Sequence, residues 1–253
     1  MCSMTIAGLI PARYASSRLP GKPLALIGDK PMIQHVYERC QQAPSLQSVV
    51  VCTDDDRVYE AVRSFGGQVV MTRADHISGT DRVAEAAQSL DVDIIVNIQG
   101  DQPFIHPDMI EEAARPLLGD DAADVATLMV RIEKEEDLHD PAVVKVVTDL
   151  SGKALYFSRS LIPYPRENTP HAVYEHAGTY AYRKDTLLRL TQLPPTTLEK
   201  VESLEQLRWL EHGLRIQVTE SRIPNPAWHG FSVDTPADLE RAGRMLSEEE
   251  ATS

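Results

Sequence analysis

Three basic residues, Arg13, Arg18 and Lys22, stand close together in the N-terminal stretch IPARYASSRLPGKP. Residues 1–28 contain no Asp or Glu, although the whole chain carries a formal net charge of −13. The Ala, Ser and Gly residues between the cations would let backbone N–H groups approach an anion closely. The stretch is not a Walker loop, because Lys22 is followed by Pro23 rather than Ser or Thr. We therefore predict an anion-binding loop; the alternative is a solvated basic loop without a ligand.

Two carboxylates could complete such a site. Asp101 follows the apolar run in VNIQGDQPFI, and Mg²⁺ typically takes one or two protein oxygens together with phosphates and waters. Beside a phosphate-binding loop, Asp101 is thus better interpreted as a metal ligand than as a turn residue. Asp234, in FSVDTPADL, precedes the Thr235-Pro236 start of a helix. Taken alone, its position indicates only a favourable charge at a helix N-terminus.

Several polar residues in the second half of the chain carry weaker signals. They are Arg159 in LYFSRS, His176 and Tyr180 in YEHAGTYAYR, and Glu205 and Gln206 in SLEQLR. A histidine in an apolar strand usually has a structural role, and a Glu-Gln pair on a helix usually faces solvent. Their spacing does not show whether they converge.

The elements that must position these residues follow an α/β pattern. The expected buried strands, dense in Ile and Val, are Thr5–Ile10, Ser48–Thr53, Gln68–Met71 and Asp93–Ile98. Amphipathic segments between them predict helices from Pro31, around 58–65, and around 83–87 with Ser78 or Thr80 as cap. A parallel sheet covered by helices would place the basic loop and Asp101 together at its carboxyl edge.

Past Asp124 the apolar runs follow one another with little helical pattern between them, which predicts a more antiparallel section. Expected strands are Val125–Ile132, Ala142–Thr148, Ala154–Ser158 and Val173–Tyr182. Helical patterns at Leu187–Leu190 and Leu198–His212 follow, then a strand at Arg215–Thr219. The last helix begins at Thr235-Pro236, where Thr235 and Asp238 have capping-box spacing.

The composition limits the function classes. The acidic balance, with a pI of about 5.0, argues against nucleic acid or an anionic membrane as partner. Three cysteines without CxxC spacing disfavour a disulfide framework, and no basic segment precedes the first apolar run. No window approaches the roughly 18 apolar residues of a membrane span. We expect a cytoplasmic protein.

Eight segments, in this order, resemble the 3-deoxy-manno-octulosonate cytidylyltransferase (CMP-Kdo synthetase) family. They are IPARYASSRLPGKPL, CTDDDRV, MTRADHISGTDRV, VNIQGDQPFI, VVKVV, ALYFSRSLIP, SLEQLR and VDTPADLE. The resemblance covers nearly the whole chain. It implies a Rossmann-like nucleotidyltransferase three-layer sandwich with a mostly parallel mixed sheet, as one domain over residues 1–253. It also implies an antiparallel section at roughly 124–183 that lines the sugar site and helps to form a homodimer.

The implied reaction joins CTP and Kdo to give CMP-Kdo and pyrophosphate for lipopolysaccharide synthesis. The resemblance assigns catalytic roles to Arg13, Lys22 and Asp101, and Mg²⁺ to Asp101 and Asp234. The implied nucleotide-binding residues are Pro11, Ala12, Arg13, Ser17, Arg18, Lys22, Arg73, Ser78, Gly79, Thr80 and Gln99. The implied sugar-binding residues are Gln102, Arg159, His176, Tyr180, Glu205 and Gln206.

Alternatives remain at this stage. The acceptor could be 8-amino-Kdo, because Gln102, Ala177 and Thr179 depart from residues that many relatives carry. A nonulosonate is the other alternative; cytidylyltransferases for such sugars usually share the RxxSxRLPGK theme but not the YFSR and SLEQLR segments, so these segments favour Kdo. A CTP-binding regulatory protein would be expected to lack one or both of the carboxylates that are present here. A glycosyltransferase usually needs a DxD motif, and the one acidic cluster of that kind, residues 54–56, is better interpreted as a helix cap.

Overall fold

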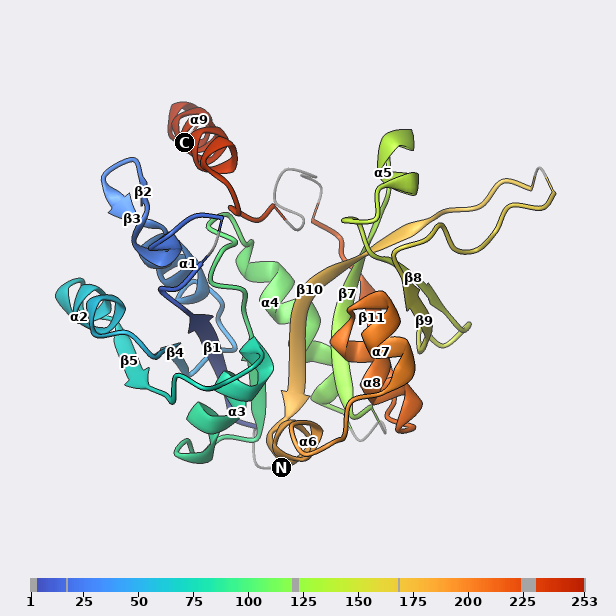
Figure 1. The fold of residues 1–253 in the computed structure, drawn as a ribbon, viewed down its shortest axis with the longest axis horizontal. Coiled ribbons are helices and arrows are strands. Elements are labelled where there is room, and N and C mark those ends of the chain that lie inside the picture. Colours follow the sequence, from blue (N-terminus) through green and yellow to red (C-terminus); the bar gives the residue numbers. More distant parts are fainter. Residues whose placement is uncertain (1–3, 17, 120–122, 168, 224–230, 253) are drawn as a thin grey trace.

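The computed structural model describes residues 4–252 apart from 17, 120–122, 168 and 224–230. Within these residues, nine strands form one mixed sheet whose main path runs β11-β7-β10-β6-β1-β4-β5 (Figure 1). The strands are β1 Ile6–Ala12, β4 Ser48–Thr53, β5 Gln68–Met71, β6 Ile94–Asn97, β7 Val125–Arg131, β8 Lys145–Thr148, β9 Ala154–Ser158, β10 Tyr174–Arg183 and β11 Ile216–Glu220. A separate two-stranded ribbon pairs β2 Leu26–Ile27 with β3 Lys30–Pro31.

The predicted parallel core is confirmed. β1 pairs in parallel with both β4 and β6, and β4 pairs in parallel with β5. Helices cover both faces of this sheet, which gives three layers (Figure 1). The helices are α1 Met32–Cys40, α2 Asp56–Ser64, α3 Gly79–Gln88, α4 Pro107–Ala114, α5 Glu135–His139, α6 Lys184–Leu190, α7 Thr197–Glu202, α8 Glu205–Glu211 and α9 Pro236–Thr252, with short 3₁₀ turns η1 Lys22–Leu24 and η2 Arg115–Leu117.

The alternating sides of the buried strands explain the two cores. Ile10 of β1 and Val51 of β4 face α1, α2 and α4, whereas Leu9 and Cys52 face α3, α6 and α8. Burying apolar side chains on both sides is what requires near-continuous Ile and Val in these strands. The sheet is therefore held rigidly between two helical layers, and its carboxyl edge can carry loops in fixed positions.

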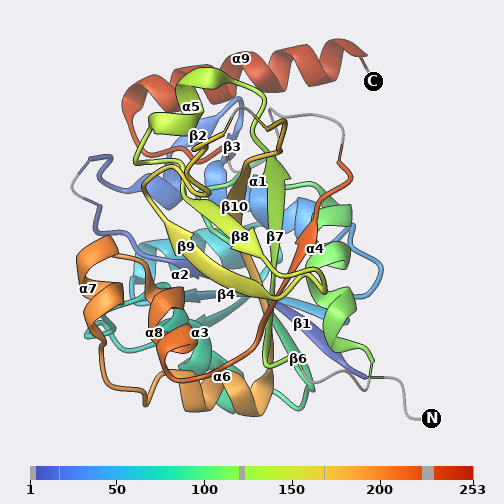
Figure 2. The same ribbon diagram turned by 90° about the vertical axis from the view of Figure 1, so that its right-hand side faces the viewer.

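The antiparallel section is also present. β10 runs antiparallel to β6, β7 and β8, while β7 pairs in parallel with β11. β8 and β9 form a hairpin that leaves the main path at the start of β10 (Figure 2). The chain between β9 and β10 extends away from the rest of the molecule (Figure 1).

Most expected elements begin or end one to three residues from the observed bounds, and two of the differences have a clear local cause. β8 begins at Lys145 rather than Ala142, because the Lys145 ammonium donates to the carbonyls of Asp140 and Val143 at 2.7 and 2.8 Å and holds them in a turn. The single helix expected over 198–212 is divided into α7 and α8 at Ser203, whose φ of 53° is left-handed. That conformation ends a helix.

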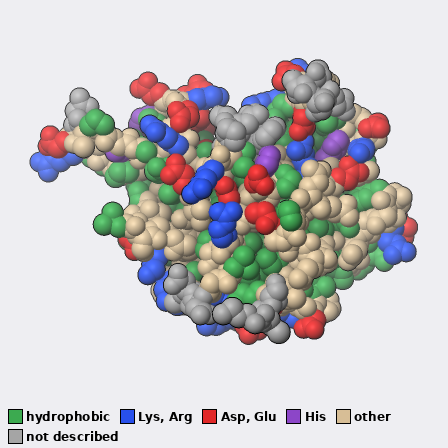
Figure 3. All heavy atoms as spheres, turned by 180° about the vertical axis from the view of Figure 1, so that it is seen from behind, with side chains coloured by type: hydrophobic (Ala, Val, Ile, Leu, Met, Phe, Trp, Pro, Cys, Tyr) green, Lys and Arg blue, Asp and Glu red, His purple; other side chains and the backbone are tan. Residues whose placement is uncertain are grey.

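No helix among the residues described is long and apolar enough to cross a membrane. On the side seen in Figure 3, Lys and Arg side chains lie interspersed with Asp and Glu side chains. Cys40 and Cys52 are free thiols buried in the two cores, and burial raises the pKa of Cys52 to about 12. Cys2 lies outside the described residues.

Candidate active site

The loops that follow β1 and β6 meet at the carboxyl edge of the sheet. Gly100 packs so closely on β1 that a Cβ there would lie 2.7 Å from the Pro11 carbonyl oxygen, so this approach requires glycine. The Val233 N–H donates to the Asp101 carbonyl at 2.9 Å and brings the start of α9 to the same place. Residues separated by more than a hundred positions thus surround one cavity of about 500 Å³.

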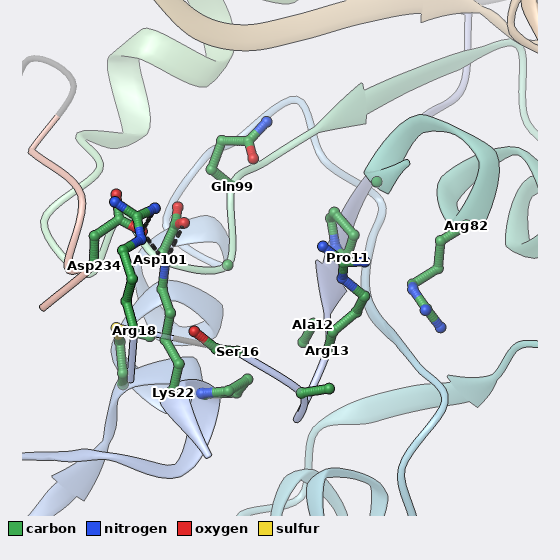
Figure 4. Close-up of a pocket in the computed structure, with 15 residues that line it drawn as sticks. Pro11, Ala12, Arg13, Ser16, Arg18, Lys22, Arg82, Gln99, Asp101 and Asp234 are labelled. Atoms are coloured by element: carbon green, nitrogen blue, oxygen red, sulfur yellow. Dashed lines mark hydrogen bonds and ion pairs between the residues drawn. The ribbon is translucent and has the colours of Figure 1, made fainter. Parts of the chain in front are cut away.

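The lining of this cavity contains much of the predicted nucleotide and metal site. The predicted residues found there are Pro11, Ala12, Arg13, Arg18, Lys22, Gly79, Gln99, Asp101 and Asp234. Ser17 lies outside the described residues. Figure 4 shows the basic side chains arriving from the loop after β1, Gln99 and Asp101 from the loop after β6, and Asp234 from the segment before α9.

A compact charge cluster occupies one end of the cavity. The Lys22 ammonium lies 2.6 Å from Asp101 Oδ2 and 2.9 Å from Asp234 Oδ1, and Arg18 contacts the same Asp234 oxygen at 2.9 Å (Figure 4). The Lys22 side chain is only 13% exposed, so its charge is screened far less than that of a surface lysine. One ammonium therefore holds two carboxylates side by side.

This donor set fits a magnesium ion. Two carboxylates that converge on one cation provide the hard oxygen ligands that Mg²⁺ takes, and phosphate oxygens and waters complete its shell. Among the residues described, no group of three or more His, Cys, Asp and Glu side chains is placed to hold a metal by itself. The arrangement thus resembles a site that shares its ion with a phosphorylated substrate more than a protein-only metal cage.

The basic loop has internal supports. Gly21 has a φ of 70° and donates its N–H to the Tyr14 carbonyl at 3.1 Å, which closes the loop before η1. The guanidinium of Arg57, from α2, lies 3.3 Å from the centre of the Tyr14 ring. The loop is therefore tied to α2 as well as to the end of β1.

The N-terminus of α3 forms the opposite side of the cavity. Ser78 is the cap, and it exchanges hydrogen bonds with Asp81 in a capping box. Glu205 accepts a hydrogen bond from Thr80 at 2.6 Å and one from Ser78 at 3.4 Å. Burial raises the pKa of Glu205, and the Thr80 hydrogen bond opposes that effect. A predicted sugar residue is thus joined directly to two predicted nucleotide residues.

Most of the other predicted sugar residues lie deeper, around β10. Gln99 donates to the Gly178 carbonyl at 3.1 Å, and this bond links the cavity to β10. Tyr180 is buried there and His176 is half-buried, with ring centres 5.1 Å apart, and the Tyr180 hydroxyl has no hydrogen-bond partner among the residues described. Gln102 and Gln206 are buried as well.

Arg159 and Arg73 are held differently from the rest. The Arg159 guanidinium donates to the carbonyls of Glu202 and Pro141 at 2.7 and 2.8 Å and, more weakly, to that of Ser203. Three of its five N–H donors are thus used, which leaves two for an anion. Arg73 is exposed and lies within 4 Å of two carboxylates, 3.5 Å from that of Asp75. It does not line the cavity.

Six lining residues were not predicted as site residues: Ala15, Ser16, Pro23, Met32, Arg82 and Gly100. Ser16 and Gly100 stand inside motifs that the sequence did single out, so their positions in the loops were the available signal. Arg82 gave no such signal, because arginine on a helix is normally exposed. Its partner is Asp54, at 2.9 Å, whereas the cap of α2 is Asp55.

His176 leads to a prediction on stability. Desolvation by burial lowers its pKa to about 4 from the usual 6.5, so the unfolded chain binds more protons between these values. Stability is then lost as the pH falls through this window. Replacing His176 with Gln is expected to remove about 2 kcal/mol of the loss between pH 7 and pH 5. Urea unfolding of both proteins at the two pH values measures this difference.

The neighbouring Glu175 provides the internal control for that measurement. Burial raises its pKa to about 7, which gives stability a pH dependence of the opposite sign. Because Glu175 is present in both proteins, its contribution cancels in the difference between them. Equal pH dependence of the two unfolding free energies would show that His176 is not the group responsible.

Sequence comparisons agree with this geometry. The cytidylyltransferase family profile matches residues 7–216. A 3-deoxy-manno-octulosonate cytidylyltransferase from Geobacter metallireducens is 50% identical over 255 residues, covering 96% of this chain and 98% of the relative. The one from Geobacter sulfurreducens is 51% identical over 254 residues, covering 96% and 100%. The chain belongs to the 3-deoxy-manno-octulosonate cytidylyltransferase family.

Solved structures have the same fold as this chain. A structure described as CMP:2-keto-3-deoxy-manno-octonic acid synthetase complexed with CTP superposes with a TM-score of 0.91 at 47% identity, covering 97% of this chain and 99% of that one. A 4-diphosphocytidyl-2C-methyl-D-erythritol synthase from Anaerococcus prevotii superposes with a TM-score of 0.65 at 12% identity. It covers 97% and 99% of the two chains, and at that identity it supports the fold alone.

Proposed function

We propose that this member of the 3-deoxy-manno-octulosonate cytidylyltransferase family transfers CMP from CTP to Kdo and releases pyrophosphate. The observation that carries the proposal is the pair of carboxylates, Asp101 and Asp234, held by Lys22 beside the basic loop. The relatives at 50% and 51% identity carry this activity in their names. They favour Kdo over the 8-amino or nonulosonate acceptors, and they disfavour a regulatory protein without turnover.

The proposed reaction is a nucleotidyl transfer that requires two substrates to be aligned and the charge on phosphate to be neutralised. The anomeric hydroxyl of Kdo attacks the α-phosphorus of CTP, the new P–O bond forms, and the bond to pyrophosphate breaks with its electron pair leaving on oxygen. The hydroxyl proton is lost in the same process. Such transfers are catalysed mainly by positioning and by neutralising charge on phosphate oxygens. We assign no covalent nucleophile.

The cations of the basic loop would neutralise the charge on the phosphate oxygens. Arg13 and Lys22 line the cavity and would pair with the triphosphate, most strongly as pyrophosphate gains charge. To do so, Lys22 must exchange its contacts with the two carboxylates for contacts with phosphate oxygens. Asp101 and Asp234 would then hold Mg²⁺, which when bound favours ionisation of an attacking hydroxyl and withdraws charge from phosphate.

The antiparallel section supplies the acceptor side of this proposal. Gln99 connects the cavity to β10, where His176 and Tyr180 lie next to each other, and Glu205 is bonded to the start of α3. Arg159 keeps two N–H donors that would bind the carboxylate of the sugar. We further propose that residues 124–183 contribute to a homodimer within a single-domain chain, and that the enzyme acts in the cytoplasm.

Pyrophosphate release tests the function directly. With Mg²⁺ and Kdo, CTP is expected to support turnover at least about tenfold faster than ATP, GTP or UTP, and omission of Kdo should abolish release. The 8-amino analogue serves as the matched acceptor. Faster turnover with that analogue or with a nonulosonate would replace Kdo in the proposal. Nucleotide binding without pyrophosphate release under any of these conditions would indicate a regulatory protein.

A further inference from the structure

Arg82 is the cavity residue that the proposed reaction leaves unexplained. It lies in the first turn of α3 and is 0% exposed, although it lines the cavity. Its guanidinium contacts three separate partners: Asp54 Oδ2 at 2.9 Å, the Thr72 hydroxyl, and the Arg73 carbonyl at 3.4 Å. These partners follow the ends of β4 and β5. Arg82 thus connects the first turn of α3 to the residues that follow β4 and to those that follow β5.

The loop over residues 72–78 is fixed to α3 through these contacts. Thr72 is held from its other side, because its N–H and hydroxyl both donate to a β4 carbonyl, at 2.8 and 3.1 Å. One turn along α3, Glu85 accepts the Arg73 N–H at 3.1 Å and contacts the His76 ring. The loop therefore takes its position from α3 rather than from packing of its own, since Ile77 at its tip is 91% exposed.

The burial of the Arg82 guanidinium is explained by these contacts. Removing a cation from water is costly unless it is paired and its N–H groups are satisfied. Asp54 supplies the pairing charge, and the planar guanidinium can reach several acceptors in fixed directions, which an ammonium cannot. The Arg82 Nε nevertheless has no hydrogen-bond partner among the residues described. An apolar residue would fill the volume without that cost, but it could not hold the loop.

We propose that Arg82, paired with Asp54, is a positioning residue for the base-binding side of the CTP site. It ties the loop at residues 72–78 to the first turn of α3, whose Gly79 packs on Pro11 and lines the cavity together with Arg82. In this way it sets the affinity for the nucleotide and the preference for cytosine. The inference rests on the proposed function, because it takes CTP as the ligand of this cavity.

The position of Arg82 separates this role from the phosphate chemistry. Figure 4 shows Arg82 beyond Pro11, Ala12 and Arg13, on the opposite side of the cavity from the cluster of Lys22 and the two aspartates. Loosening the loop should therefore weaken the grip on the base and leave charge neutralisation at the phosphates intact. The expected signature is a change in KM for CTP without a matching change in kcat.

Replacement of Arg82 with Lys tests the role, since Lys keeps the charge but cannot bridge the three acceptors. The KM and the calorimetric Kd for CTP are expected to rise about tenfold or more, with kcat at saturating CTP within about threefold of the parent. The KM for Kdo should not change. The ratio of kcat/KM between CTP and UTP should fall, because the first turn of α3 lines the end of the cavity away from the phosphate-binding cluster, where the base would lie. Arg63→Lys, at an exposed site on α2, is the matched control and should behave as the parent.

Two further variants keep the test decisive if Arg82→Lys does not fold. Asp54→Asn removes the negative charge paired with Arg82, and Thr72→Val removes a hydroxyl acceptor, each with little change in shape. Both variants should raise the Kd for CTP. Unchanged CTP affinity in the folded variants, or a loss confined to kcat, would overturn the positioning role. A parent protein that binds no CTP would instead overturn the proposed function, and this inference with it.

Discussion

Replacing Asp101 with Asn is expected to lower kcat/KM by at least about 10²–10³-fold, while the fold is retained. Asn has nearly the same shape as Asp but lacks the negative charge with which Asp101 contacts Lys22 at 2.6 Å and would hold Mg²⁺. Asp101 is only partly buried, so its loss should change the melting temperature by no more than a few degrees. Steady-state pyrophosphate release and a thermal melt measure the two quantities.

Cation binding gives a second readout that does not depend on turnover. In the presence of CTP, calorimetric titration with Mg²⁺ should show weaker binding to Asp101→Asn than to the parent. Asp108→Asn, an exposed residue in the first turn of α4, is the matched control and should leave both activity and cation affinity unchanged. Near-normal activity of Asp101→Asn in Mg²⁺ would refute its role as a metal ligand.

Replacing Lys22 with Ala is expected to raise the KM for CTP and to lower kcat by about 10²-fold. Both parameters change because the contact with phosphate exists in the bound state and strengthens as pyrophosphate gains charge. Lys22 also neutralises Asp101 and Asp234, at 2.6 and 2.9 Å. Without nucleotide, the variant should therefore bind a divalent cation more tightly than the parent does, because the competing ammonium is gone.

Opposite shifts in the two affinities distinguish this role from simple damage to the loop. Lys30→Ala removes a lysine whose partner is Glu38 outside the cavity, and it should leave both affinities unchanged. An effect of Lys22→Ala limited to the KM for the sugar would show that Lys22 does not bind the triphosphate.

The parallel half of the fold could be predicted because each of its elements is determined by local pattern. The expected strands Ser48–Thr53 and Gln68–Met71 coincide with β4 and β5, since their Val residues are bounded by turn residues. Ser78 could be named as a possible cap for α3 for the same reason. The division of residues 198–212 at Ser203 could not, because a non-glycine residue in the left-handed region is held there by tertiary contacts.

The candidate site divides along similar lines. The loop residues Arg13 and Lys22 and the carboxylate of Asp101 were predictable, because parallel strands bring the loops after β1 and β6 to one edge. The contact between Lys22 and Asp234 was not, because it joins residues 212 positions apart and no local pattern encodes it. Arg82 was missed for the opposite reason: its helix was predicted correctly, but the burial of a charged side chain depends on a partner from another strand end.

The Val233 N–H donates to the Asp101 carbonyl, and this contact completes the pair of carboxylates only after almost the whole chain has been synthesised. The basic loop, the β6 loop and the α3 cap are all synthesised within the first 101 residues, well before Asp234 leaves the ribosome. During translation the nucleotide-facing wall can form while one of the two carboxylates is still missing. A chain interrupted before residue 233 would be expected to keep much of its nucleotide-binding surface and yet be catalytically silent.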